Sequence, residues 1–226
     1  MKKISILGST GSIGVNTLNV IRELNEDFSI KYLTANSNSE LLIEQAIEFR
    51  PKTVVMVNKE KAKIVKEALK IFGMNVMVGR EGLLECAADS DVNILLNGLV
   101  GSAGMEPTFQ AVKSGVDVAL SNKESLVIAG ELINHEKEAT GSTIFPVDSE
   151  HSAIWQCLTG ESMDDVRRII LTGSGGPFLN KNAKSFNKIT PEEALNHPNW
   201  DMGNKITIDS ATMMNKGLEI IETYWL

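Results

Sequence analysis

Short apolar runs alternate with amphipathic stretches along most of the chain. Runs rich in Val, Ile and Leu are typical of strands that are buried on both faces, and apolar residues three or four positions apart predict helices. The runs predict strands at Lys3–Leu7, Ser29–Ala35, Thr53–Val57, Met74–Val78, Asp91–Asn97, Val116–Leu120 and Thr143–Glu150. The stretches between them predict a helix after Gly14 that runs through Leu18, Ile21 and Leu24, and helices at Ser39–Phe49, Lys59–Phe72, Glu81–Ala88, Pro107–Ser114 and Ser125–Ile133. This alternation predicts an α/β fold with a parallel sheet.

The pattern is less regular beyond Glu150. We expect helices at Ala153–Leu158 and Pro191–Leu195, and strands at Val166–Leu171 and Lys205–Ile208. The segment Asn180–Lys188 between them is polar and predicts a loop.

A glycine-rich turn follows the first strand. Its glycines, Gly8, Gly11 and Gly14, lie three residues apart and lead directly into the first helix. Such a turn allows close backbone approach to a pyrophosphate, and Ser9, Thr10 and the helix N-terminus offer donors. The spacing differs from G-x-G-x-x-G, and a glycine-rich turn that binds nothing is the alternative.

The second strand ends in the segment Thr34–Asn38, where a nucleotide-binding fold places the residue that contacts the ribose. No acid occurs before Glu40, whereas Asn36, Ser37 and Asn38 can donate hydrogen bonds. The segment therefore favours NADP over NAD. An ordinary Asn- and Ser-rich turn explains the same residues.

Two further segments follow predicted strand ends. The first, Gly98–Gly104, is a second glycine-rich loop that could border the same cleft. The second, Ser121–Glu124, contains Lys123, which could donate a proton or bind a negatively charged group. A surface lysine that begins a helix is the alternative interpretation.

Asp148 and Glu150 lie two residues apart after the apolar run that begins at Thr143. If the strand continues to Glu150, both carboxylates lie on one face, which suits a hard divalent cation. The alternative is the start of a helix, with Asp148 or Ser149 as its N-cap.

Three later segments carry polar side chains of interest. The Gly173–Gly176 turn around Ser174 could form a backbone nest for a phosphate, and no base is evident that would make Ser174 a nucleophile. His197 and Trp200 lie on an irregular segment that either packs shut or closes on a ligand. Asn215 and Glu219 are four residues apart on one predicted helical face, with Lys216 beside them.

Bulk properties limit the possible classes. The chain has 226 residues, a formal charge of -7 and no long basic run, which argues against a nucleic-acid surface. Cys86 and Cys157 are isolated, so neither a disulfide framework nor a zinc cluster is indicated and a reducing compartment fits. No signal peptide and no apolar run long enough for a membrane helix is evident, so we expect a cytoplasmic protein without a membrane partner.

Six motifs in this order resemble the 1-deoxy-D-xylulose 5-phosphate reductoisomerase family. They are Gly8–Gly14, Ser121–Glu124, Val147–His151, Gly173–Phe178, His197–Trp200 and Lys205–Glu219. The resemblance implies an enzyme of non-mevalonate isoprenoid synthesis that rearranges 1-deoxy-D-xylulose 5-phosphate and reduces the product to 2-C-methyl-D-erythritol 4-phosphate. It also implies NADPH, a divalent cation (Mg²⁺ or Mn²⁺) and a homodimer.

The resemblance also implies roles for individual residues. It implies metal ligands at Asp148, Glu150 and Glu219, with Lys123 and His197 also in the active site. It implies cofactor contacts from Thr10, Gly11, Ser12, Ile13, Ala35, Asn36, Asn38, Asn122 and Glu124. It implies substrate contacts from Ser149, Ser174, Ser210, Asn215 and Lys216, with His197 and Trp200 on a mobile flap.

The resemblance implies a Rossmann-like NADPH-binding domain at 1–146 and a partial α+β catalytic domain at 147–226, with the family's C-terminal helical domain absent. If this chain were the whole molecule, Tyr224 and Trp225 would be exposed, which predicts poor solubility. The 2′-phosphate loop lacks the basic residue that is common in the family. The alternatives are another NADP-linked α/β oxidoreductase, which as a semialdehyde dehydrogenase would need a catalytic Cys, and a non-catalytic nucleotide-binding protein.

Overall fold

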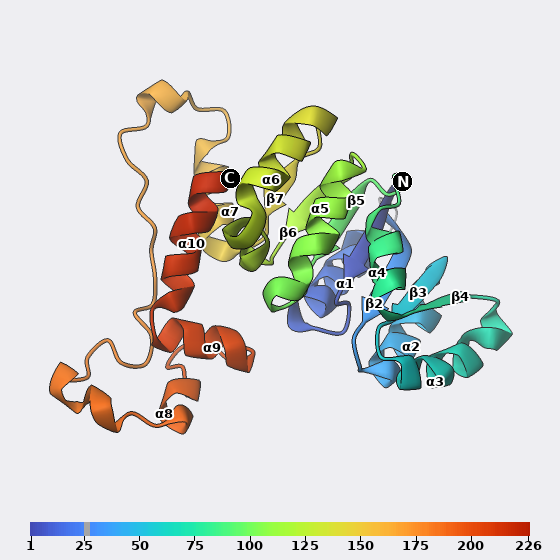
Figure 1. The fold of residues 1–226 in the computed structure, drawn as a ribbon, viewed down its shortest axis with the longest axis horizontal. Helices are drawn as coiled ribbons and strands as arrows, with labels where there is room; N and C mark the ends of the chain where they lie inside the picture. The colour runs from blue at the N-terminus through green and yellow to red at the C-terminus, as the bar shows by residue number, and fades with distance from the viewer. Residues whose placement is uncertain (25–27) are drawn as a thin grey trace. The chain divides into compact units, whose positions relative to one another are not determined.

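The computed structural model describes residues 1–24 and 28–226, which divide into two compact units, 1–149 and 150–226. The first unit is built on a parallel sheet whose strand order, in the described residues, is β4-β3-β2-β1-β5-β6-β7 (Figure 1). The strands are β1 (Lys2–Leu7), β2 (Phe28–Ala35), β3 (Thr53–Met56), β4 (Asn75–Val78), β5 (Ile94–Asn97), β6 (Asp117–Leu120) and β7 (Ile144–Pro146). The predicted α/β class with a parallel sheet is confirmed.

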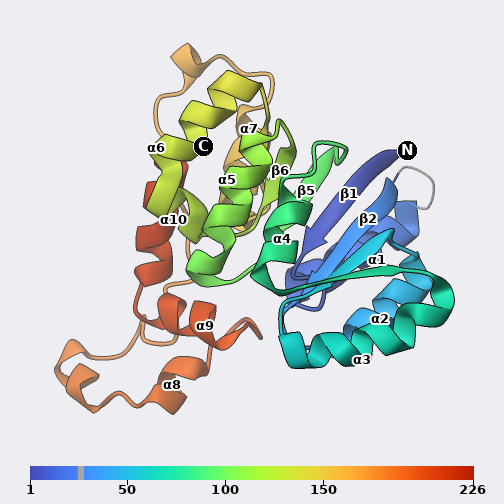
Figure 2. The ribbon, with the colours of Figure 1, turned by 45° about the vertical axis from the view of Figure 1, so that its right-hand side comes forward.

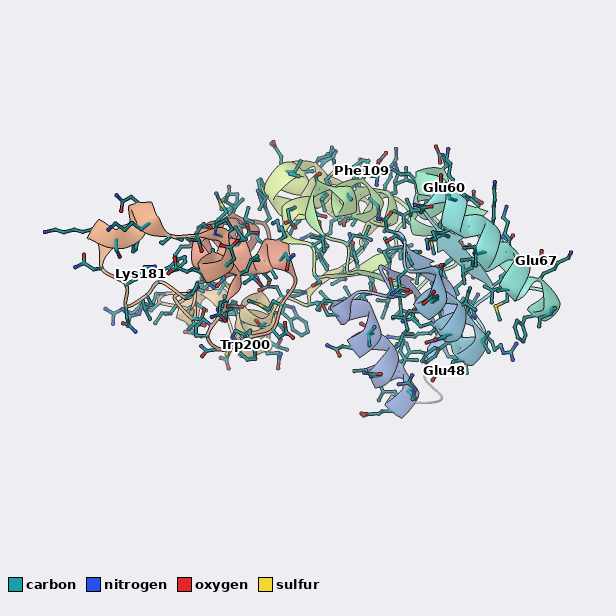
Figure 3. All side chains as sticks on the ribbon, turned by 90° about the horizontal axis from the view of Figure 1, so that it is seen from below. Glu48, Glu60, Glu67, Phe109, Lys181 and Trp200 are labelled. Carbon is teal, nitrogen blue, oxygen red and sulfur yellow. The ribbon has the colours of Figure 1, made fainter. Side chains whose placement is uncertain are left out.

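Three helices cover one face of this sheet, α1 (Ser12–Leu24), α2 (Ser39–Phe49) and α3 (Lys59–Leu69). Their buried residues Leu18, Leu42 and Val65 belong to one core cluster with apolar side chains from β1, β2, β3 and β5. Glu60 and Glu67 lie on the exposed face of α3 (Figure 3). The helical spacing of apolar residues thus determines which side of each helix packs on the sheet.

The remaining helices of this unit are α4 (Gly79–Ala87), α5 (Met105–Lys113) and α6 (Lys123–Thr140). They lie side by side along the sheet (Figure 2). Leu83, Ala111 and Leu126 are their buried contacts with the core. α6 is longer than the predicted Ser125–Ile133 and contains a kink at Ala129.

The predicted strand Thr143–Glu150 is wrong in its second half. β7 ends at Pro146, which pairs with Leu120, and the helix α7 (Ser149–Leu158) begins three residues later. Proline lacks the N–H that would continue a ladder, and Ser149 and Glu150 favour a helical first turn. Asp148 and Glu150 therefore do not share a strand face, and the helix-start alternative describes the backbone.

The second unit is helical or irregular in its described residues. After α7 come the short 3₁₀ segments η3 (Met163–Asp165) and η4 (Ala183–Lys188), then α8 (Pro191–Leu195), α9 (Asn204–Ala211) and α10 (Met214–Trp225). A capping box between Thr190 and Glu193 starts α8, as Pro191 at the first helical position also favours.

Two strands predicted in this unit are wrong. Val166–Leu171 lies outside helices and strands. Lys205–Ile208 lies inside α9, where Thr207 Oγ1 bonds to the Gly203 carbonyl at 2.9 Å and the Lys205 ammonium contacts Asp209 at 2.6 Å. The Lys-Ile-Thr-Ile alternation suggested a strand, but the burial of Thr207 and Ala211, four residues apart, follows the helical period.

Among the described residues, no helix combines the length and apolar character needed to cross a membrane. At the end of α10, Tyr224 is 78% exposed and Trp225 is partly buried.

Candidate functional site

The first glycine loop lies where the strand order reverses. β1 pairs with β2 on one side and β5 on the other, and the loops that leave these strands separate at this point. Open α/β sheets bind ligands in the resulting crevice at the carboxyl ends of their strands. The Gly98 N–H donates to the Leu7 carbonyl at 3.0 Å, which places the second glycine loop directly beside the first.

The spacing of the glycines follows from close backbone contacts. Gly8 has a φ of +80°, and a Cβ there would lie 3.1 Å from the Gly98 carbonyl oxygen. A Cβ at Gly14 would lie 2.4 Å from the Gly8 carbonyl oxygen, so the start of α1 packs against the loop with no space for a side chain. Gly11 meets only an ordinary contact at 3.4 Å.

Three residues at the front of the loop are accessible. Gly11 and Ser12 are exposed, Thr10 is partly exposed, and α1 has no acid in its first turn. The first N–H groups of a helix lack partners within it, so an anion can bind there. Ile13 instead packs toward Gly98.

Ser9 supports the loop from behind. Its hydroxyl is fully buried and donates to the Thr34 carbonyl at 3.2 Å, while the Gln45 amide donates to the Ser9 carbonyl at 2.9 Å. The prediction that the Ser9 side chain offers a donor to a pyrophosphate is therefore wrong. Gln45, which the sequence analysis missed, fixes this loop from α2.

The predicted ribose segment lies at the end of β2. The Ala35 side chain is buried, and Asn36, Ser37 and Asn38 are exposed. The Asn38 side chain caps α2 by accepting from the Leu41 N–H at 3.2 Å. Three exposed polar residues therefore lie at this strand end, and the preference for NADP stays a prediction.

Asn122 organises the second glycine loop. Its Nδ2 donates to the carbonyls of Leu99 and Gly101 at 2.9 and 2.8 Å, and its Oδ1 accepts from the Ser125 N–H. A Cβ at Gly104 would lie 2.5 Å from this amide. Asn122 also donates to Glu124 at 3.2 Å. Both polar groups of the Asn122 side chain thus contact protein atoms.

Lys123 and Asp148 form an ion pair in the first unit. The Lys123 Nζ lies 2.7 Å from Asp148 Oδ2, and their side chains are only 8% and 11% exposed. Lys123 begins α6, and Asp148 directly precedes α7. The alternative of a solvated surface lysine is excluded by this burial.

Glu150 and Glu219 meet at one ammonium group in the second unit. Lys216 Nζ lies 2.9 Å from Glu150 Oε1 and also contacts Glu219 Oε2, while Asn215 Nδ2 donates to Glu219 Oε1 at 2.5 Å. Burial alone would lower the pKa of Lys216, but the hydrogen bonds and charges of both carboxylates outweigh this and raise it. The predicted grouping of an amide, an ammonium and a carboxylate on one helical face is present.

A glycine-rich loop lies against the same helix. Gly175 and Gly176 both have positive φ, and a Cβ at Gly176 would lie 2.6 Å from the Ser210 carbonyl oxygen. A Cβ at Gly173 would lie 2.8 Å from Lys216 Cε. The loop around Ser174 therefore adjoins both Ser210 and Lys216.

The predicted flap residues are on the surface of the second unit. His197 Nε2 lies 3.1 Å from Ser174 Oγ, and its Nδ1 accepts from the N–H groups of Asn199 and Trp200. Trp200 is 64% exposed (Figure 3). The segment therefore does not bury its tryptophan, whereas His197 is fixed beside the serine loop.

The two cysteines differ in environment. Burial raises the pKa of Cys86 to about 12, and nearby carboxylates act in the same direction. A buried thiol with this pKa is not a nucleophile at neutral pH. Cys157 is exposed on α7.

Comparisons with known proteins agree along the whole chain. Residues 4–130 match the family model described as 1-deoxy-D-xylulose 5-phosphate reductoisomerase, and residues 144–226 match the model of its C-terminal domain. Relatives of that name from Chloroherpeton thalassium and Clostridium acetobutylicum are 54% and 51% identical over the entire chain. The chain spans 58% and 59% of the length of these two relatives.

Solved structures give the same result. A DOX-P reductoisomerase in complex with NADPH, fosmidomycin and magnesium superposes with a TM-score of 0.92 at 39% identity, covering 100% of this chain and 58% of the other. A 1-deoxy-D-xylulose 5-phosphate reductoisomerase from Zymomonas mobilis in complex with NADPH gives 0.91 at 40% identity, covering 99% and 57%. The chain belongs to the 1-deoxy-D-xylulose 5-phosphate reductoisomerase family.

Proposed function

We propose that the protein carrying this chain converts 1-deoxy-D-xylulose 5-phosphate to 2-C-methyl-D-erythritol 4-phosphate, with NADPH and a divalent cation. The observation that supports it most is the grouping of Glu150, Glu219, Asn215 and Lys216 beside the Ser174 loop. Carboxylates next to a glycine-rich loop that can present backbone N–H groups to a phosphate suit a phosphorylated sugar that also needs a hard cation. A non-catalytic nucleotide-binding protein would have no use for this combination.

The donor set fits the implied cation. Asp148 and Glu150 lie two residues apart in sequence. Glu150 and Glu219 both contact the Lys216 ammonium group. We assign all three as its ligands, because Mg²⁺ and Mn²⁺ prefer oxygen ligands. When bound, such a cation polarises the carbonyl oxygen of the substrate and stabilises negative charge on it.

The residues around the carboxylates bind and orient the substrate. In our assignment, Lys216, Asn215, Ser174, Ser210 and Ser149 bind the polar groups of the substrate, with its phosphate on the serine loop and Lys216. Binding energy from a phosphate remote from the reacting carbons can be used to close the flap. His197 and Trp200 then exclude water from the reacting groups. In the same assignment, the positively charged ammonium group of Lys123 lies beside the substrate oxygens.

The first unit binds the dinucleotide in this proposal. Thr10, Gly11, Ser12 and Ile13 hold the pyrophosphate at the start of α1, since the exposed N–H groups of that helix suit an anion. Ala35, Asn36 and Asn38 contact the ribose that carries the 2′-phosphate. Asn122 holds the second glycine loop, and we assign Asn122 and Glu124 to the nicotinamide end of the cofactor. NADPH supplies the hydride for the reduction.

A competing assignment as a semialdehyde dehydrogenase finds little support. That chemistry needs a reactive cysteine at the cofactor, and the cysteine of the sheet unit, Cys86, is buried and has a raised pKa. Cys157 belongs to the other unit.

The test is the absorbance of NADPH in the presence of 1-deoxy-D-xylulose 5-phosphate. We expect oxidation of NADPH by the full-length protein, its loss on addition of a chelator, and its recovery with Mg²⁺ or Mn²⁺. Glu150→Gln should lower turnover by at least about a hundredfold, because it removes one anionic ligand. Turnover that resists both the chelator and this substitution would refute the assignment.

Three finer statements belong to the same proposal. Manganese serves as well as magnesium, because the ligand set is all oxygen. The protein acts in the cytoplasm, in keeping with two isolated cysteines. It acts as a homodimer, which light scattering on the full-length protein tests directly.

A further inference from the structure

A buried histidine connects the two helices that carry Glu150 and Glu219. His151 lies on α7, and its Nε2 is 3.0 Å from the main-chain oxygen of Glu219 and 3.0 Å from Thr223 Oγ1. Its Nδ1 lies 3.4 Å from Glu222 Oε2 on α10. The side chains of His151 and Glu222 are 1% and 0% exposed, so this contact is shielded from water.

The connection is adjacent to the carboxylates on both helices. His151 directly follows Glu150, and Glu222 follows Glu219 by three residues, or about one helical turn. Thr223 Oγ1 also donates to the Glu219 main-chain oxygen at 2.7 Å. A shift of α7 along α10 would therefore break the histidine contacts and change the separation of Glu150 and Glu219 together.

We propose that His151 and Glu222 are positioning residues that hold Glu150 and Glu219 at the spacing required to bind a divalent cation. This inference rests on the proposed function, because it concerns the same cation. Stability alone does not require such a contact, because apolar side chains can often replace even a buried ion pair. The hydrogen bonds from His151 Nε2 to α10 are directional and fix the register of the two helices, and Glu222 closes the other side of the same imidazole ring. Residues behind metal ligands commonly control metal affinity in this way.

The experiment measures Mn²⁺ binding by the full-length protein, by electron paramagnetic resonance of the free ion, together with thermal unfolding. Glu222→Gln and His151→Gln preserve side-chain size and are the test variants. Glu219→Gln removes a proposed ligand and is the reference for loss of the site. Thr207→Val is the matched control, because Thr207 is buried in the same unit and its hydroxyl bonds to the main-chain carbonyls of Met202 and Gly203, shortly before it in the chain.

We expect the test variants to bind Mn²⁺ about tenfold more weakly than the wild type, and Glu219→Gln to lose binding. Thr207→Val should unfold at a lower temperature and keep its Mn²⁺ affinity within about twofold, because it removes a hydrogen bond to main-chain carbonyls and none to Glu150 or Glu219. A double variant, His151→Phe with Glu222→Leu, should remain folded by circular dichroism and still bind weakly.

Unchanged affinity in Glu222→Gln and His151→Gln, with binding lost in Glu219→Gln, would overturn the positioning role and leave the proposed function intact. Complete loss in Glu222→Gln, equal to that in Glu219→Gln, would make Glu222 a ligand and also overturn it. Failure of the wild type to bind Mn²⁺, or unimpaired binding by Glu219→Gln, would reject the proposed metal site and the inference with it.

Discussion

The substitution Gly14→Ala tests how tightly the first glycine loop is packed. The added Cβ would lie 2.4 Å from the Gly8 carbonyl oxygen and 2.5 Å from Ser9 Cα, whereas ordinary contacts begin near 3.4 Å. The overlap is therefore about 1 Å with main-chain atoms, which cannot rotate away. Overpacking of this kind costs about 1–3 kcal/mol. We take the upper end because both neighbours are backbone.

A gain in helix propensity opposes this cost. Gly14 lies in α1, and alanine is about 1 kcal/mol more favourable than glycine inside a helix. We therefore expect the free energy of unfolding to fall by about 2 kcal/mol. For a domain of this size, that corresponds to a decrease in Tm of about 4–8 °C.

Thermal unfolding followed by circular dichroism measures the change, and a fluorescence titration with NADPH reports the state of the loop. Gly11→Ala is the matched control, because residue 11 lies in the same loop and its Cβ would make only an ordinary contact. Its Tm should stay within about 2 °C of the wild type. Equal stability of Gly14→Ala and the wild type would refute the packing argument.

Three other predictions concern the first unit and the cysteines. Asn122→Ala should lower the free energy of unfolding by about 1–3 kcal/mol and weaken NADPH binding, measured by denaturant unfolding and titration, because it leaves the partly buried carbonyls of Leu99 and Gly101 without their donor. A thiol reagent should modify Cys157 in the native protein and Cys86 only after unfolding, because Cys86 is buried with a pKa raised to about 12. Burial raises the pKa of Asp89, but hydrogen bonds, chiefly from Lys31, outweigh it and leave the pKa below its ordinary value. The resulting stabilisation is present above about pH 4 and is lost as pH falls through the lower folded pKa. Lys31→Met should therefore destabilise the protein near neutrality and have less effect in acid unfolding near pH 2, and an equal loss at both values would contradict this.

The sheet could be predicted from the sequence because its strands are buried on both faces. In a run such as Thr53–Met56 every residue is buried, so no position faces solvent as one face of a surface helix would. The helices that follow have a clear apolar stripe and a polar cap, as Asn58 provides for α3. In the first unit, the local sequence pattern agrees with the burial that the fold imposes, so most helices and strands there were predicted correctly.

The second unit was predicted less well because its short elements have ambiguous patterns. The Lys205–Ile208 segment alternates like a strand, and only the buried positions of Thr207 and Ala211 distinguish the helix. Val166–Leu171 has the composition of a strand, but no described strand of this chain pairs with it. Strand propensity alone does not produce a strand without a partner.

In the candidate site, the sequence predicted some residues and missed others. Motif spacing identified candidate binding groups, such as Glu150, Lys216 and Ser174, because their chemistry is evident in the sequence. It missed the groups that hold them, because those contacts join residues far apart in sequence. His151 meets Thr223 across 72 positions, and Gln45 meets Ser9 across 36. Spacing arguments apply within one helix or strand and do not detect such pairs.

Both units use buried polar side chains to fix exposed functional loops and helices. Gln45 and Asn122 each bond to main-chain carbonyls of a glycine loop in the first unit, and His151 bonds to a main-chain carbonyl of α10 in the second. Main-chain contacts of this kind determine where the backbone lies without occupying the surface that meets a ligand. The exposed residues can then bind a cofactor or substrate without also maintaining the fold. Substitutions behind the loops should consequently change ligand affinity through geometry, with the ligand-binding side chains still present.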